Sequence, residues 1–348
     1  QVITPSKASG AQIIDGSLRV SDGTNGQYMS RTATSGNRRI WTWSAWLKRE
    51  QLVDKQTFMF AETDGSNQTS FGFSHSGATP ASGFYFRTEI SGSVTNATID
   101  ASLRDCSSFY HIVVACDTNQ SAADDRVKVY INGTLQTWST SPGMAQNDLL
   151  QINHNVQQEL FSTSQLADLD AKVTQVYLLD GAALGPENFG FTDPLTNTWK
   201  PKKYNVPKAD TVLVGTPTYA SSDFKTTGDK TSDQTGLTFS SWSGSYTGAE
   251  TKLFKNSTDS AFTLNINLVG GTTDRYLWGS NNLTNWTYIA NAGARHYQLS
   301  GYKYYATSEG SSSTALQAVA ENGPNSFYLP LDGNSPIGQD KSGNGNDW

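Results

Sequence analysis

The sequence predicts an almost all-β protein with two β-sandwiches, the second of them inserted near the end of the first. Charged residues are scarce, at 16%, whereas Gly, Ser, Thr and Asn are abundant, as is typical of strands joined by tight turns. The 9 Trp, 15 Tyr and 15 Phe residues supply enough large side chains for a buried core. Stretches of alternating apolar and polar residues recur along the chain, and helical signals are few.

The clearest strand spans residues 40–49, with the sequence IWTWSAWLKR. Alternate side chains point to opposite faces of a strand, so Trp41 and Trp43 lie on one face and Trp46 on the other. Because both faces carry tryptophan, we expect this strand to be covered on both sides, with all three rings in the core.

Shorter strands are expected at residues 71–73 and 84–86 and a longer one at 173–179, while the apolar run at 111–115 is typical of a central strand with His111 in the core. Residues 157–172 show a weak helical pattern. A single helical turn is expected at residues 186–189, because Pro186 stands at its start.

A β-hairpin is predicted where the alternating segment 127–131 meets Asn132 and Gly133. Asn-Gly is a strong hairpin signal because both residues tolerate the positive φ that a tight turn requires. The return strand is expected at residues 134–138.

A second sandwich is expected after the segment 199–204, where the pattern of aromatic and turn residues changes. Residues 262–268, FTLNINL, alternate strictly, and further strands are expected at 276–278 and 286–290. We therefore assign residues 1–205 to the first domain and 206–322 to the inserted one. Residues 323–348 then either pack back on the first domain or lead into a further one.

Net charge and cysteine content narrow the function classes. A formal charge of −6 argues against nucleic acid as a partner, because phosphate binding requires clustered Lys and Arg. No apolar run approaches the ~20 residues of a membrane-spanning helix. Cys106 and Cys116 flank a predicted strand of about 33 Å, too long for a disulfide between them. Free thiols fit assembly in a reducing cytoplasm.

Three segments resemble the laminin-G/concanavalin A-like jelly roll of tailed-phage virion proteins, notably those of phages of marine cyanobacteria. The segment 17–49 resembles the opening of that domain, with Ala33 where the family has proline. The segment 110–133 resembles its "W-H-(I/V)-V … V-K-(L/V)-Y-(V/I)-(D/N)-G" hairpin, and 176–204 resembles its last strand and tail. The residues of the first segment that fit are Tyr28, Ser30, Arg31, Thr32, Asn37, Arg38, Trp41, Thr42, Trp43, Ser44, Trp46, Lys48 and Arg49.

The resemblance extends to residues 327–348, which in such phage proteins follow that tail closely and are themselves followed by further chain. Here about 120 residues intervene, hence the expected insertion. The inserted part weakly resembles discoidin-type modules, through residues 276–290 and Tyr304-Tyr305. The family resemblance implies a virion structural protein, assembled in the host cytoplasm, whose partners are other virion proteins, a host surface glycan and further copies of itself.

Catalytic residues are not expected. The retaining hydrolases of this fold carry E-x-D-x-x-E on one strand, and the nearest string here has Glu62 and Asp64 but Asn67 in the third place. We expect these residues to form a turn. The four histidines are scattered, without the close pairs of a zinc site, and no G-x-S-x-G nucleophile elbow occurs.

Binding residues are expected in loops. No cofactor is required, but calcium is a candidate ligand, since Asp117, Asn119, Asp124 and Asp125 flank one loop and supply oxygen ligands. A polar hairpin loop without metal is the favoured interpretation. For carbohydrate, the candidates near turns are Trp138, Trp242 and Trp278, although burial in the sandwich is favoured for each.

The leading hypothesis is therefore a non-enzymatic virion protein, a tail fibre or spike component with a lectin-like adhesion module. Three alternatives stay open at this stage. They are a capsid decoration protein, a secreted calcium-assisted lectin and a polysaccharide depolymerase.

Overall fold

The computed structural model divides the chain into two compact units, Gln1–Lys208 with Gly323–Trp348, and Ala209–Asn322. The structure describes residues 11–21, 27–52, 54–74, 82–163, 168–206, 212–213, 238–240, 251–255, 261–269, 275–282, 285–291, 296–309, 317–320, 323–334 and 336–348. The fold is almost all β, which confirms the predicted class. Within the described segments no helix is long and apolar enough to cross a membrane.

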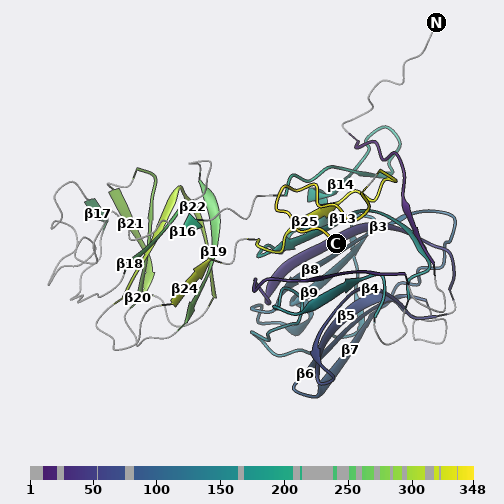
Figure 1. The fold of residues 1–348 in the computed structure, drawn as a ribbon, viewed down its shortest axis with the longest axis horizontal. Coiled ribbons are helices and arrows are strands. Elements are labelled where there is room, and N and C mark those ends of the chain that lie inside the picture. Colours follow the sequence, from purple (N-terminus) through teal and green to yellow (C-terminus); the bar gives the residue numbers. More distant parts are fainter. Residues whose placement is uncertain are drawn as a thin grey trace, which may run out of the picture. The chain divides into compact units, whose positions relative to one another are not determined.

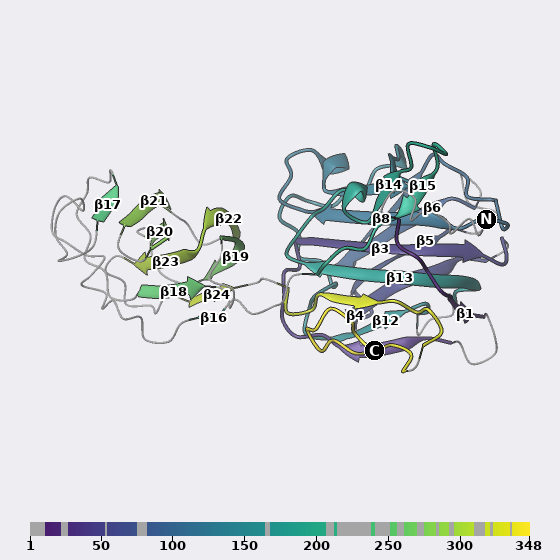
Figure 2. The ribbon, with the colours of Figure 1, turned by 90° about the horizontal axis from the view of Figure 1, so that it is seen from above.

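The first unit is a sandwich of two seven-stranded antiparallel sheets (Figures 1 and 2). Sheet A has the strand order β1 (Leu18–Val20), β13 (Ala171–Asp180), β3 (Ile40–Arg49), β8 (Tyr110–Asp117), β9 (Val127–Ile131) and β10 (Thr134–Leu135), and β25 (Phe327–Leu329) also pairs with β13. Sheet B has the order β11 (Trp138–Thr140), β7 (Ser93–Ile99), β6 (Phe84–Ile90), β5 (Asn67–Phe73), β4 (Gln56–Asp64), β12 (Gln157–Leu160) and β2 (Met29–Thr32).

The core between the sheets is aromatic. Trp41 stacks on Phe71 with ring centroids 5.9 Å apart, and Trp43 stacks on Phe58 at 5.4 Å. All four side chains are completely buried, which confirms the predicted inward face of β3. Trp46 lies on the opposite, outer face of sheet A, as the alternation predicted, but it is only partly buried and not a core residue as expected. There it stacks on His111 at 4.9 Å.

The outer face of sheet A is covered by chain that follows β13. This covering consists of η2 (Pro186–Asn188), β14 (Gly190–Thr192) and β15 (Trp199–Pro201). It forms a second apolar cluster in which Phe189 packs on Tyr177. The single turn predicted at residues 186–189 is confirmed.

The predicted hairpin is confirmed, with φ of 48° at Asn132 and 83° at Gly133. Its return strand is shorter than expected, because β10 ends at Leu135 and the chain then crosses to sheet B as β11, where Trp138 lies opposite Ile99. The predicted helix at residues 157–172 is wrong. Its first residues form β12, which pairs with β4 on one side and β2 on the other. Strand pairing on both sides overrides a weak helical propensity.

The edge of β13 opposite β3 pairs with two short strands, one after the other along its length. β1 pairs with residues 171–173 and β25 with residues 176–178. Between them β13 has an irregularity at Thr174–Tyr177, and Gln175 adopts a φ of 54°. A bulge of this kind turns a side chain away from the regular alternation, and positive φ in a residue other than glycine is strained.

The second unit contains two sheets. One has the order β16 (Val212–Leu213), β18 (Thr251–Lys255), β23 (Tyr304–Glu309), β20 (Arg275–Ser280), β21 (Asn285–Asn291) and β17 (Thr238–Ser240). The other has β22 (His296–Tyr302), β19 (Phe262–Val269) and β24 (Gln317–Ala320). The strands predicted at residues 262–268, 276–278 and 286–290 are present, whereas the likeness to discoidin modules stays a prediction.

Candidate functional site

Two of the three tryptophans considered as sugar-stacking candidates lie in the described part of the chain, and both contact other parts of the protein. Trp138 is partly buried against the core and donates its indole N–H to the carbonyl of Val127 at 3.0 Å. Trp278 is completely buried in β20, between β21 and β23, as the favoured interpretation had it, and so has no exposed ring face for a sugar. Trp242 lies outside the described residues.

The residues predicted to hold calcium do not form a ligand cluster. Asp117 accepts hydrogen bonds from the backbone N–H of Asn119 at 3.1 Å and from the side chain of Gln120. Asp125 pairs with Lys128 at 3.2 Å, and Asp124 accepts a bond from the Ser141 hydroxyl. Among the described residues no group of three or more His, Cys, Asp or Glu could hold a metal. Calcium at this loop stays a prediction.

The string that resembles a glycosidase motif lies in the β4–β5 hairpin, but Glu62 and Asp64 belong to the end of strand β4 and not to the turn as expected. β4 ends at Asp64 and β5 begins at Asn67, whose side-chain amide donates to the Asp64 carboxylate at 3.0 Å. This bond and the backbone N–H of Ser66 lower the pKa of Asp64. A catalytic acid requires the opposite shift.

A buried serine–histidine pair lies on the outer side of sheet A. The Trp199 indole N–H donates to Nδ1 of His111 at 2.9 Å, and His111 Nε2 lies 2.9 Å from the Ser44 hydroxyl. An indole can only donate, so Nδ1 accepts and Nε2 carries the proton that it donates to Ser44. A catalytic base would have to accept from the serine instead. Burial lowers the pKa of His111 to about 3, which keeps the ring neutral. The pair is therefore structural.

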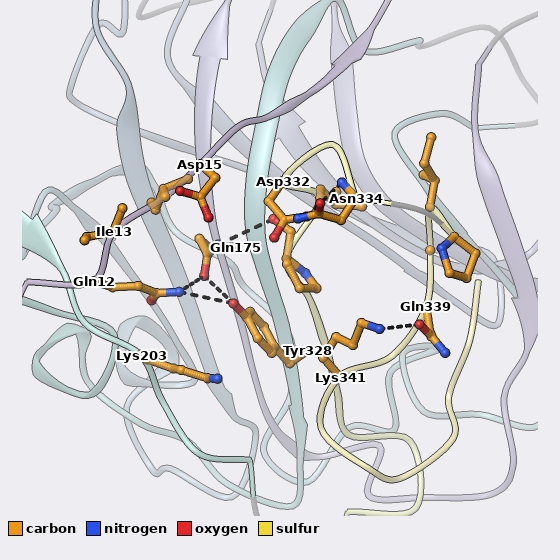
Figure 3. A pocket seen from close by; sticks show the side chains of 16 residues that line it. Gln12, Ile13, Asp15, Gln175, Lys203, Tyr328, Asp332, Asn334, Gln339 and Lys341 are labelled. Atoms are coloured by element: carbon orange, nitrogen blue, oxygen red, sulfur yellow. Dashed lines mark hydrogen bonds between the residues drawn. The ribbon is translucent and has the colours of Figure 1, made fainter.

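A pocket of about 400 Å³ opens where β1 and β25 meet on β13 (Figure 3). Small-molecule sites span roughly 300–1,000 Å³. We call it the junction pocket. Its walls are the segment that precedes β1, the bulge of β13 and the segment that follows β25. The residues that line it include Gln12, Ile13, Asp15, Gln175, Lys203, Tyr328, Asp332, Asn334, Ile337 and Lys341.

Part of the wall of the junction pocket is a triangle of uncharged hydrogen-bonding groups. Gln12 donates its amide to Oε1 of Gln175 at 2.6 Å and to the Tyr328 hydroxyl at 3.2 Å, and that hydroxyl donates to Gln175 at 2.6 Å. The bulge at Gln175 is what aims this amide at the other two. Three chain segments thus meet in one rigid polar network.

Charged residues surround this triangle with the two signs apart. In Figure 3 Asp15 and Asp332 lie on one side of Gln175, and Lys203 and Lys341 lie on the other. The Lys203 amine lies 5.7 Å from the Tyr328 ring centroid, in the position of a cation–π contact. Burial opposes ionisation of Asp332, but hydrogen bonds from Asn334 prevail and lower its pKa, so it is a carboxylate at neutral pH.

Apolar side chains border the junction pocket. Ile13 is 78% exposed and Ile337 is 59% exposed. Ile14 separates the pocket from a second hollow of about 340 Å³, which Trp46 and Phe109 line. Sequence reasoning missed both hollows. No pattern in the sequence pointed to them, since a bulge such as that at Gln175 has no sequence signature.

Residues 22–178 match the laminin G-like model of the concanavalin A-like lectin/glucanases superfamily. The matched segment of the first unit is therefore similar to the concanavalin A-like superfamily. This confirms the laminin-G/concanavalin A-like part of the resemblance noted in the sequence, whereas its phage part stays a prediction. No curated protein sequence matches the chain. Within the concanavalin A-like domain, the matched segment includes Gln175 but neither of the two segments that complete the junction pocket.

Solved structures with a similar fold include glycan-binding and tailspike proteins. Domain 4 of the arabinanase AbnA from Geobacillus stearothermophilus, in complex with arabinotriose, is 19% identical, with a TM-score of 0.34 and coverage of 49% of this chain and 69% of that one. A heptameric SAP-like pentraxin from Limulus polyphemus is 14% identical, with a TM-score of 0.35 and coverage of 50% and 80%. Tailspike protein 2 of the Escherichia coli O157:H7 bacteriophage CAB120 is 13% identical, with a TM-score of 0.34 and coverage of 52% and 28%. The superfamily also includes enzymes, but similarity at this level says nothing about activity.

Proposed function

We propose that this chain is a non-enzymatic structural protein on the surface of a tailed-phage virion, a tail fibre or spike component whose concanavalin A-like domain attaches to a host glycan. The observation that carries the glycan-binding part is the junction pocket, a concave site lined by amides, carboxylates and amines. Sugar hydroxyls both donate and accept, so such a mixed lining suits them. The virion role rests on the order and spacing of the motifs shared with phage proteins.

Binding without hydrolysis fits the chemistry of the junction pocket. Glycoside hydrolysis uses two carboxyl groups on opposite sides of the scissile bond, one of them an acid of raised pKa. Asp15 and Asp332 lie on the same side of Gln175, and the pKa of Asp332 is lowered rather than raised. These carboxylates can accept hydrogen bonds from sugar hydroxyls, but Asp332 cannot protonate a leaving oxygen at neutral pH.

The binding part is tested with Gln175→Gly. Glycine adopts the positive φ of this position without strain, so the backbone is kept while the amide is lost. We expect at least a tenfold loss of affinity for extracted host-surface polysaccharide, or about 1.4 kcal/mol. Ser91→Gly is the matched control, because Ser91 also has a positive φ, of 50°, but lies in the exposed β6–β7 turn. If both variants bind the polysaccharide as tightly as the unaltered protein does, the junction pocket is not the glycan-binding site.

The virion part is tested by immunogold electron microscopy of whole particles with antibody against this chain. Label on tail fibres or at the tail tip is the expected result. Label over the head would instead make the chain a capsid decoration protein, and the absence of label would refute the virion role. Release of reducing sugar from the same polysaccharide would refute the non-enzymatic part.

A further inference from the structure

We propose that the junction pocket selects a sugar residue that carries a carboxylate, such as a uronic acid unit of an acidic polysaccharide. This inference rests on the proposed glycan binding and names the class of glycan. The separation of charge across the pocket carries it. A neutral hexose offers hydroxyls in every direction, whereas the pocket offers cations at one side and anions at the other.

The two lysines are the groups that can bind an anion, and Lys341 also interacts electrostatically with Asp332, whose pKa it helps to lower. Lys203 faces the Tyr328 ring, and the Lys341 amine donates to the side-chain carbonyl of Gln339. The salt bridges found among the described residues, Arg19–Asp170, Arg87–Glu89, Lys128–Asp125 and Lys172–Glu50, include neither of them. Both amines line the junction pocket, so a carboxylate bound on that side would lie near positive charge.

The opposite side of the junction pocket suits the hydroxyl groups of the same sugar. Carboxylates are acceptors only, so Asp15 and Asp332 would repel a second anionic group but can accept from hydroxyls. Hydrogen bonds from Asn334 lower the pKa of Asp332 against the effect of burial, so this preference holds at neutral pH. A sugar with one carboxylate can therefore bind in one orientation, its acid group toward the lysines.

The uncharged parts of the junction pocket match the rest of such a sugar. The Gln12–Gln175–Tyr328 triangle lies between the two charged sides and presents a fixed polar surface. The exposed Ile13 and Ile337 border the opening, where they can cover the C–H face of a sugar ring.

The experiment uses the full chain and a panel of oligosaccharides in matched pairs, each uronate beside its neutral hexose counterpart, titrated by calorimetry. We expect at least tenfold tighter binding of the acidic member of a pair. We also expect this preference to weaken as salt rises from about 0.05 to 0.5 M, because ions screen charges at the surface of a pocket. Because the salt series uses the unaltered protein, its result does not depend on whether a variant folds.

The variants are Lys203→Met and Lys341→Met, with Lys202→Met as the matched control. Lys202 is the sequence neighbour of Lys203, but its amine bonds to the carbonyl of Glu187 and does not line the pocket. Each pocket variant should lose at least fivefold in affinity for the acidic sugar, while the control keeps it and all three keep the melting temperature.

The outcomes separate this proposal from the proposed function. Equal binding of acidic and neutral sugars, or equal loss in Lys202→Met, overturns the acidic-sugar proposal and leaves glycan binding in place. Failure of every sugar and of the host polysaccharide to bind overturns glycan binding itself.

Discussion

Replacement of Trp199 by phenylalanine should destabilise the first unit by removing one hydrogen bond. The indole N–H donates to Nδ1 of His111, a side chain with 0% exposure. In Trp199→Phe that nitrogen keeps no donor and no access to water, which costs about 1–3 kcal/mol. The six-membered ring of the indole lies against Gly133 and Gly190, so the smaller phenylalanine also loses part of this packing, which adds to the cost. With a urea m-value of about 2 kcal/mol/M, the midpoint should fall by about 1 M.

The assay must report on the first unit alone, since the chain has two compact units. Cys116 does so, because it is a buried free thiol in β8 and the chain has only one other cysteine, Cys106. In a Cys106→Ser background, labelling of Cys116 at increasing urea measures unfolding of that unit directly.

A double-mutant cycle tests the reasoning further. Trp199→Phe and His111→Leu should show a coupling energy of about 1–2 kcal/mol, since the two residues share one hydrogen bond. Independent costs for the two changes would refute the assignment of that bond. So would a nitrogen NMR spectrum with the proton on Nδ1 of His111, because Trp199 could not then donate to it.

Three further predictions concern the first unit. Gly133→Ala should cost about 2 kcal/mol in urea titration, because alanine resists the φ of 83° and its Cβ would lie 2.5 Å from the Trp199 ring. Trp43→Ala should cost about 3–5 kcal/mol by the same thiol assay, because it empties the centre of the core. The lowered pKa of His111 means that stability is complete above 6.5 and falls as the pH drops toward about 3, where charging a buried ring has cost up to about 5 kcal/mol. A His111→Gln variant should lack this slope, and an equal slope in both proteins would contradict it.

The strands of the first unit could be predicted because local patterns decide them. Alternation placed Trp41 and Trp43 inward, and Asn132-Gly133 marked the hairpin. The side of Trp46 was predicted correctly, but not what covers it. The outer face of sheet A is covered by side chains such as Phe189, just before β14, and Trp199 of β15. Partners that distant in sequence leave no trace in a strand's own alternation.

The junction pocket could not be predicted for a related reason. Its parts come from three distant segments, and a bulge at Gln175 brings them together. Trp278, a candidate because it lies near a turn, is buried by the second unit's own strands, as was favoured. Proximity to a turn in sequence does not tell whether a neighbouring strand covers the side chain.

The two short strands on the edge of β13 also govern when the first unit can finish folding. Tyr328 and Gln175, which bond across this edge, are 153 residues apart in the sequence. A ribosome releases β13 long before β25. The part of the β13 edge that pairs with β25, residues 176–178, therefore stays unpaired while the whole second unit is being made. An open edge of this kind invites pairing with another nascent chain. Assembly in a crowded cell should thus be most vulnerable to aggregation during that interval, and least once the last strand has closed the sheet.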